Sequence, residues 1–251
     1  LNFIKHSPVR GYINGFTDNS TARGEGKLNL QLDIPLSDKP TTVIGNYHFS
    51  DNEISLDEYI PVARKVTGDL VFTESSLSAK NIGAQMLGGP ASLAIQTDTG
   101  GALKIKLQGK ANMGEWRKVN PTHLLQSLNG GAEWAATVSV QDKQFAVAVT
   151  SNLQGLDSDL PAPLSKRANE VIPLKFELRS ASASQDVMWL QYGDLVSARM
   201  VRTDDNKNVR TIKRGYVNFG PVRRVPDRDG IWIAGTLPFG FSARYSGVDC
   251  S

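Results

Sequence analysis

The segment KLNLQLDIP (residues 27–35) alternates strictly between apolar and polar side chains. Every second position is apolar, and these positions are Leu28, Leu30, Leu32 and Ile34. Successive side chains of a β-strand point to opposite faces, whereas a helix repeats every 3.6 residues. The segment therefore predicts a strand with one apolar and one polar face, which is typical of antiparallel sheets.

Three later segments repeat this alternation: ALKIKLQGK (102–110), QFAVAVTS (144–151) and PLKFELRS (173–180). Their apolar positions are Leu103, Ile105, Leu107, Phe145, Val147, Val149, Leu174, Phe176 and Leu178. Turn-forming sequences such as TDTGG (97–101) and TDDNKN (203–208) are typical of hairpin connections. In total, roughly 14 short segments resemble strands, as is usual for an antiparallel sheet.

So many strands limit the choice of fold. Open twisted sheets rarely exceed about ten strands without curling or splitting. We expect a mainly β chain, forming a sandwich, a barrel or a long, strongly twisted antiparallel sheet curled into an open groove. Alternation alone does not choose among these, and by itself it favours an ordinary sandwich core.

One short helix is predicted near residues 121–129, within VNPTHLLQSLNGG. Asn120 suits the N-cap and Pro121 the first helical position, and Gly130 or Gly131 can end the helix. Leu124, Leu125 and Leu128 would form its buried stripe.

A weak internal repeat is also visible. VIGNYHFSDNEISL (43–56) aligns without gaps on VTGDLVFTESSLSA (66–79), with valine, glycine and phenylalanine recurring in place. Each copy resembles a strand, a polar turn and a second strand, and repeated hairpins indicate a sheet that grows along one axis.

Composition sets further limits. The chain has 251 residues and a net charge of +3, and its 40% apolar and 21% charged residues favour a folded chain over bulk disorder. Its one cysteine excludes an internal disulfide framework and a cysteine-rich metal site. It has no run of 18 apolar residues that would span a membrane. Because it starts with Leu1 and lacks a signal-peptide pattern, we expect a fragment of a larger protein.

No pattern of catalytic residues is present. The three histidines, His6, His48 and His123, have no metal-ligand spacing, and neither a GxSxG elbow nor a phosphate-binding glycine loop occurs. Basic residues gather between Arg199 and Arg228 but alternate with acids, which favours a solvated hairpin face over a nucleic-acid or head-group contact. We expect no enzyme activity, cofactor, metal or nucleic-acid partner.

The segment LQGLDSDLPAPLSK (153–166) interrupts the alternation with two prolines and four leucines. Proline lacks the N–H that a strand interior needs, so we interpret this segment as a stiff structural corner rather than a ligand contact.

With its flanks, SNLQGLDSDLPAPLSKRANEVIPLKFEL (151–178) resembles a signature of the bacterial AsmA-like envelope proteins, in the YhdP branch. VTGDLVFTESSLSAKNIGAQMLGGPASLAI (66–95) is similar to a second element of that branch, through Gly68, Leu70, Phe72 and the LGGP run at 87–90. GGAEWAATVSV and PDRDGIWIAGTL fit as well, so the resemblance runs from about residue 40 to residue 237.

The resemblance implies a periplasmic part of a Gram-negative protein anchored in the inner membrane outside this chain. Members are similar to bridge-like lipid carriers, whose curled sheet moves phospholipid between the inner and outer membranes and supports the outer-membrane barrier. Residues 1–251 would be one elongated groove segment, with a module break near 153–170 as an option. The groove would hold phospholipid acyl chains, and other envelope proteins are further candidate partners.

The implied lining is the apolar face of the alternating strands: Leu28, Leu30, Leu32, Leu103, Ile105, Leu107, Phe145, Val147, Val149, Leu174, Phe176 and Leu178. The alternative is a structural scaffold that binds envelope proteins along a sheet edge. A glycan-binding sandwich is a third class, but the four tryptophans are too scattered along the sequence to favour it.

Overall fold

The computed structural model of the chain describes residues 21–35, 42–55, 60–141, 144–204, 210–220, 228–236 and 242–248. Within these residues it contains sixteen strands and two short helices, so the mainly β fold class is confirmed. The chain divides into two compact units. Unit 1 comprises Leu1–Ala111 and Thr137–Phe145, and unit 2 comprises Asn112–Ala136 and Ala146–Ser251. His6 and Cys250 lie outside the described residues.

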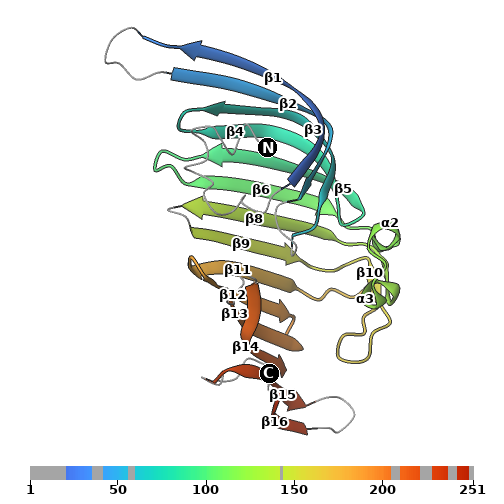
Figure 1. Cartoon of the computed structure of the whole chain (residues 1–251). Coiled ribbons are helices and arrows are strands. Elements are labelled where there is room, and N and C mark those ends of the chain that lie inside the picture. The colour runs from blue at the N-terminus through green and yellow to red at the C-terminus, as the bar shows by residue number, and fades with distance from the viewer. Residues whose placement is uncertain are drawn as a thin grey trace. The chain divides into compact units, whose positions relative to one another are not determined.

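Unit 1 is an antiparallel meander. Its strands are β1 (Thr21–Asp33), β2 (Thr42–Ser55), β3 (Ala63–Thr73), β4 (Leu77–Met86), β5 (Gly89–Thr97) and β6 (Leu103–Lys110), and each pairs with the next in the chain (Figure 1). The predicted hairpin at 97–101 joins β5 to β6, where the Asp98 carboxylate accepts from the N–H groups of Gly100 and Ala102. The boundary between the units passes through β8 (Glu133–Gln141) and β9 (Gln144–Ser151).

Unit 2 continues with β11 (Leu174–Ser182), β12 (Gln185–Tyr192), β13 (Val196–Asp204), β14 (Arg210–Phe219), β15 (Gly230–Thr236) and β16 (Ser242–Val248). β9 pairs with β11, and the later strands pair in chain order. Every described pair is antiparallel except β14 and β15, which are parallel. The second predicted hairpin, at 203–208, lies mostly outside the described residues.

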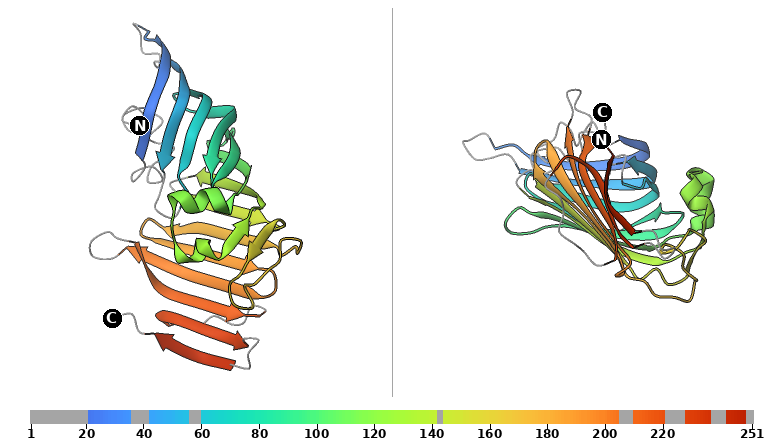
Figure 2. Two further views of the ribbon diagram at one scale, coloured as in Figure 1. Left: turned by 90° about the vertical axis from the view of Figure 1, so that its right-hand side faces the viewer. Right: turned by 90° about the horizontal axis from the view of Figure 1, so that it is seen from below.

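Four short elements of unit 2 stand outside the main sheet: α2 (Met113–Val119), α3 (His123–Gln126), β7 (Leu128–Gly130) and β10 (Leu156–Ser158). The helices contact each other and β7, which pairs with β10 (Figure 2). The remaining strands form one 14-stranded sheet with β1 and β16 as its end strands, so the sheet does not close into a barrel.

The predicted short helix near 121–129 is present as α3, but it is shorter than expected and a second helix, α2, precedes it. Asn120 caps the end of α2, where its N–H donates to the Trp116 carbonyl, and Thr122 is the N-cap of α3. Leu125 is buried, but Leu124 is 56% exposed and Leu128 belongs to β7. The chain leaves the helix after Gln126 because its next residues pair with β10, so the three leucines form no common stripe.

The predicted repeat is also wrong as a structural unit. Residues 66–79 form strand, turn and strand, but residues 43–55 lie within the single strand β2. Asp51 and Asn52 resemble a turn in sequence, yet they form a bulge, with Asp51 at φ +59°. The buried Asn52 side chain accepts from the Ser50 N–H and donates to the Arg23 carbonyl of β1, which holds the strand through the irregularity.

Candidate functional site

The strand register places six of the predicted lining residues on one face of unit 1. Directly opposed residues of an antiparallel pair point to the same side of the sheet. Leu30 opposes Gly45, Gly45 opposes Phe72, and Phe72 opposes Leu77. Ala79 lies two residues after Leu77 on β4 and opposes Ile95, which in turn opposes Ile105. Alternation within β1 and β6 then adds the remaining predicted residues, Leu28, Leu32, Leu103 and Leu107.

We call this surface the apolar face of unit 1. It comprises the six predicted residues together with Val43, Tyr47, Phe49, Val66, Leu70, Phe72, Leu77, Ala79, Ile82, Ala84, Met86, Leu93 and Ile95. Sequence reasoning missed the contributions of β2 to β5. Bulges in β4 and between β2 and β3 shift the alternation and hide it from a simple count.

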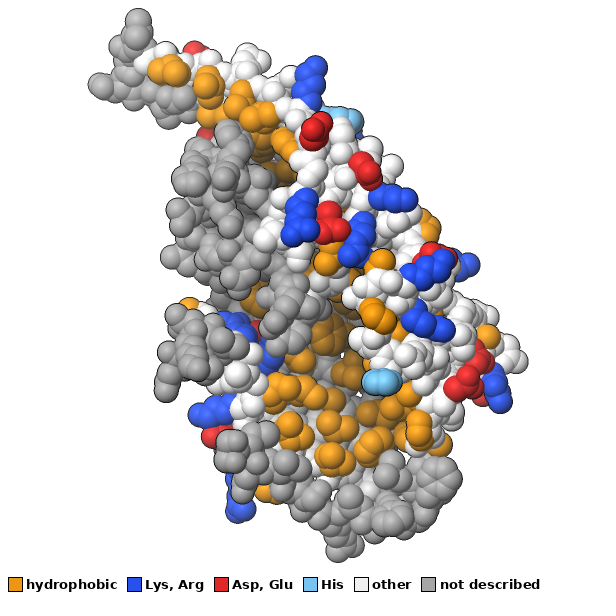
Figure 3. Space-filling model, turned by 45° about the vertical axis from the view of Figure 1, so that its right-hand side comes forward, with side chains coloured by type: hydrophobic (Ala, Val, Ile, Leu, Met, Phe, Trp, Pro, Cys, Tyr) orange, Lys and Arg blue, Asp and Glu red, His pale blue; other side chains and the backbone are white. Residues whose placement is uncertain are grey.

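Exposure varies strongly along this face. The residues on β3 and β4 are buried, as is Leu103, whereas Ile105 and Leu107 are half-buried. On β1, Leu28, Leu30 and Leu32 are 37%, 41% and 55% exposed. A row of hydrophobic side chains is visible along these N-terminal strands at the top of Figure 3. Three exposed leucines in a row on one strand face are more than scattered surface hydrophobicity and mark a candidate binding surface.

The other face of β1 and β6 is polar. Lys27, Asn29 and Gln31 on β1, and Lys104, Lys106 and Gln108 on β6, are all exposed. Aromatic rings keep the apolar side continuous where glycines leave gaps. The Phe72 ring lies over Gly45, and the Tyr47 ring lies over Gly26. Tyr47 and Phe49 also pack edge to face, with centroids 4.8 Å apart.

Unit 2 has an apolar face of its own. Val149 opposes Phe176, which opposes Leu190, and Val147 opposes Leu178, which opposes Met188. The face continues through Tyr192, Val196, Ala198, Met200, Val217 and Phe219, and it also includes the predicted residue Leu174. Val147 and Leu178 are buried, Val149, Leu174 and Phe176 are half-buried, and Leu190 is exposed. Hydrophobic side chains also gather over unit 2 in the lower half of Figure 3. Phe145, in the unit 1 part of β9, is half-buried.

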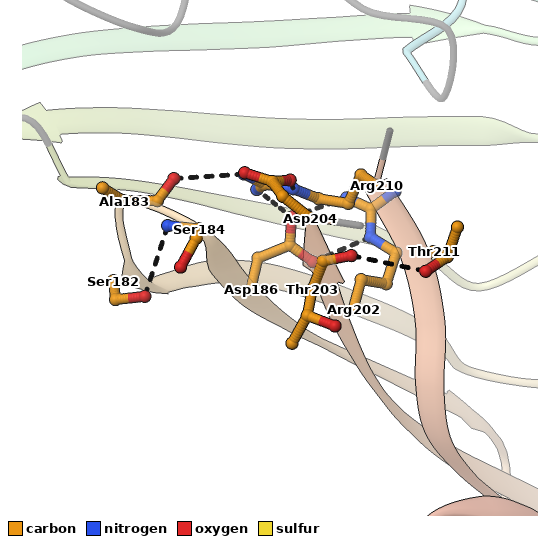
Figure 4. Close-up of polar contacts among 9 residues, drawn as sticks. All are labelled: Ser182, Ala183, Ser184, Asp186, Arg202, Thr203, Asp204, Arg210 and Thr211. Carbon is orange, nitrogen blue, oxygen red and sulfur yellow. Dashed lines mark hydrogen bonds and ion pairs between the residues drawn. The ribbon is translucent and has the colours of Figure 1, made fainter. Parts of the chain in front are cut away.

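Beyond Met188 and Met200, the unit 2 face becomes charged. Asp186 lies two residues before Met188 on β12 and opposes Arg202 on β13. Asp204 at the end of β13 opposes Arg210 on β14. Arg202 Nε and Nη2 donate to the two Asp186 oxygens at 2.7 and 2.8 Å, and Arg210 Nη1 donates to Asp186 Oδ2 at 2.8 Å (Figure 4). Arg210 Nε and Nη2 donate to Asp204 at 2.7 and 3.2 Å. We call these four residues the charged row.

Burial differs within the charged row. Asp186 is fully buried and Arg202 is 3% exposed, whereas the Arg210 and Asp204 side chains are 24% and 25% exposed. The hydrogen bonds from Arg210 hold the pKa of Asp204 below its ordinary value, and those to Asp204 raise the pKa of Arg210. The sequence-based expectation of a solvated hairpin face is therefore wrong for Arg202 and Arg210. Sequence reasoning missed this pairing because nothing in the residues around Asp186 indicates that its side chain is buried.

The opposite face of unit 2 carries aromatic and charged residues. The guanidinium carbons of Arg179 and Arg199 lie over the Trp189 ring, at 6.0 and 5.4 Å from its centroid. Arg179 also pairs with Glu177 at 2.8 Å. This face therefore holds an arginine–carboxylate pair that is separate from the charged row.

The proline-containing corner at 153–166 is tied together by backbone contacts. The buried Lys166 ammonium donates to the carbonyls of Leu156 and Arg167 at 2.9 and 2.8 Å, and Lys166 bridges to Ser158 through the main chain. Burial lowers the pKa of Lys166. Gly155 approaches Gly130 and Gly131 so closely that a side chain would strike backbone oxygen. These contacts favour the structural interpretation of the corner.

Within the part of the chain that the structure describes, no group of histidine, cysteine or acidic side chains is arranged to hold a metal ion. His48 pairs with Asp69 at 3.1 Å on the surface, and His123 is exposed on α3. Among the described residues, no helix is long and apolar enough to cross a membrane. The apolar face of each unit and the charged row of unit 2 are therefore separate candidate sites.

Comparison with known proteins supports a family assignment. A family model described as YhdP protein matches residues 1–240. The chain is also similar to the intermembrane phospholipid transporter YhdP of Escherichia coli (strain K12), at 20% identity over 254 residues. That match covers 92% of this chain and 20% of the relative, so the chain spans about a fifth of the relative's length. No solved structure matches the chain.

Proposed function

Because this chain belongs to the YhdP family, we propose that it is a phospholipid-binding segment of an intermembrane lipid carrier. In this proposal acyl chains lie against the apolar faces of units 1 and 2, and the segment works in the periplasm. The name of the E. coli relative supports the class of cargo. The observation that carries the proposal is the row of exposed leucines on β1, which continues across six strands of unit 1.

The physical basis is simple burial of hydrocarbon. Each acyl methylene removed from water contributes about 0.8 kcal/mol, so a lipid tail is retained without a specific polar contact. Leucine, isoleucine and phenylalanine at successive positions present similar contacts to a tail. A lipid can therefore move along such a face without meeting a deep minimum, and the proposed movement requires no catalytic group.

The test is lipid mass spectrometry on the chain purified from bacteria without detergent. We expect phospholipid to be retained at a reproducible ratio. Leu30→Asp places a charge on an exposed position of the apolar face and should lower the retained lipid by at least about fivefold. Gln31→Asp adds the same charge to the polar face of the same strand and should leave it unchanged.

A second pair of variants tests the far side of the same face. Ile105→Asp should also reduce lipid retention, whereas Gln108→Asp on the polar face of β6 should not. Circular dichroism confirms that each variant keeps its sheet. Equal lipid retention in both members of each pair would contradict the proposal.

The alternative function is a scaffold that binds other envelope proteins along a sheet edge. It is favoured by β1, an end strand of the main sheet whose 13 residues are all exposed. Such edges are prone to pairing with an additional strand. A stable, monodisperse protein that is free of lipid would support the scaffold and contradict lipid carriage by this segment.

A further inference from the structure

The charged row shares its face with the apolar residues of unit 2. Side chains two residues apart on a strand point to the same side and lie about 6–7 Å apart. Asp186 is two residues from Met188, and Arg202 is two residues from Met200. An amphiphile whose tail lies along Phe176, Leu178 and Met188 would therefore bring its polar end to the charged row.

The row has a fixed inner pair and an accessible outer pair. Asp186 and Arg202 are buried and joined by two hydrogen bonds, so water and ligands do not reach them. Arg210 and Asp204 are each about a quarter exposed. The Arg210 guanidinium is held by two further hydrogen bonds, from Nη1 to Asp186 Oδ2 at 2.8 Å and from Nη2 to the Ala183 carbonyl at 3.2 Å. Its Nε and Nη2 face Asp204, and this contact can be exchanged without opening the buried pair.

We propose that Arg210 and Asp204 recognise the head group of a zwitterionic phospholipid that carries a primary ammonium, as in phosphoethanolamine. The phosphate takes the place of the Asp204 carboxylate on Arg210, and the ammonium pairs with Asp204. Two planar N–H donors on one guanidinium suit a phosphate well, and an ammonium donates to a carboxylate where a quaternary amine cannot. This inference rests on the proposed function and assigns its head-group class.

Charge balance selects the zwitterion. The four residues of the charged row comprise two cations and two carboxylates, and all four are in contact. A zwitterion exchanges one ion pair for two and leaves the site neutral. A net anionic head group would place its phosphate on Arg210 and leave Asp204 beside it without a cation, which is unfavourable in a partly desolvated site.

The experiment uses the whole chain and mixed vesicles. Vesicles contain equal amounts of phosphatidylethanolamine and phosphatidylglycerol in a phosphatidylcholine background. After incubation, the protein is separated from the vesicles by gel filtration, and its bound lipids are quantified by mass spectrometry. The ratio of captured phosphatidylethanolamine to phosphatidylglycerol is the readout, and for the wild type we expect clear enrichment of phosphatidylethanolamine.

Two matched variants locate the selectivity. Asp204→Asn removes the carboxylate of the outer pair and should lower the captured ratio by about fivefold, as expected for one partly exposed charge contact. Glu177→Gln removes the carboxylate of the Arg179 pair on the opposite face and should leave the ratio unchanged. Melting curves and circular dichroism confirm that both variants remain folded.

Each outcome decides the inference. A wild-type ratio equal to that of the vesicles, or enrichment of phosphatidylglycerol, overturns the head-group assignment while leaving lipid binding intact. Wild-type enrichment that persists in Asp204→Asn overturns the role of Asp204. Capture of no lipid at all overturns the proposed function and this inference together. The wild-type ratio alone is decisive if Asp204→Asn fails to fold.

Discussion

Asp186→Asn tests whether the charged row is a buried network that holds unit 2 together. The Asp186 side chain is fully buried and accepts three charge-assisted hydrogen bonds, two from Arg202 and one from Arg210, at 2.7–2.8 Å. Asparagine has the same size, but it carries no charge and turns an N–H₂ group toward donors. The buried Arg202 guanidinium then loses the carboxylate that neutralises it.

The magnitude follows from the burial of both partners. Removing one member of a buried ion pair typically costs about 3–5 kcal/mol, because the remaining charge is left desolvated. For a urea dependence of about 2 kcal/mol per molar, this corresponds to a shift of about 2 M in the unfolding midpoint. Asp204→Asn, in the partly exposed pair, should lower the free energy of unfolding by only about 1 kcal/mol.

The assay is urea unfolding followed by tryptophan fluorescence, since Trp189 and Trp232 both lie in unit 2. The double variant Asp186→Leu with Arg202→Met should be more stable than the two single variants predict, because it leaves neither charge buried alone. A midpoint shift for Asp186→Asn no larger than that for Asp204→Asn would refute the reasoning. It would mean that water reaches the pair in solution.

Two further predictions concern acid stability and sheet packing. Arg210 holds the pKa of Asp204 below its unfolded value of 3.8, so the carboxylate contributes stability that is present above that pH and lost as the pH falls through the folded pKa. The difference in unfolding free energy between wild type and Asp204→Asn should therefore vanish in acid, and urea titrations from neutral pH to well below 3.8 measure it; a constant difference would contradict this account. Gly45→Val should destabilise unit 1 by about 2–3 kcal/mol, because its side chain meets the Phe72 ring. The control is Gly83→Val, whose added Cβ has its nearest neighbour at 3.9 Å and which should change the stability by no more than about 0.5 kcal/mol. Thermal melts of both variants measure the difference, and equal destabilisation would show that the Phe72 ring moves aside for the valine.

Local patterns predicted the strands well. The alternating segments that start at Lys27, Ala102, Gln144 and Pro173 all form strands, because side-chain alternation is a property of a few consecutive residues. The same patterns misled where a local irregularity resembled a turn. Asp51 and Asn52 have the composition of a turn, but the Asn52 side chain bonds to β1, a strand that is distant in sequence.

The sequence by itself determined that this chain is mainly β, that its strands have one apolar and one polar face, and that its motifs resemble the YhdP branch. Only the tertiary structure decided which strand faces coincide, since each bulge moves the following residues to the other side of the sheet. It also decided that Asp186 and Arg202, sixteen positions apart, form a buried pair at the end of the apolar face. Strand pairing brings such residues together, and burial then turns two ordinary surface residue types into an ion pair that water does not reach.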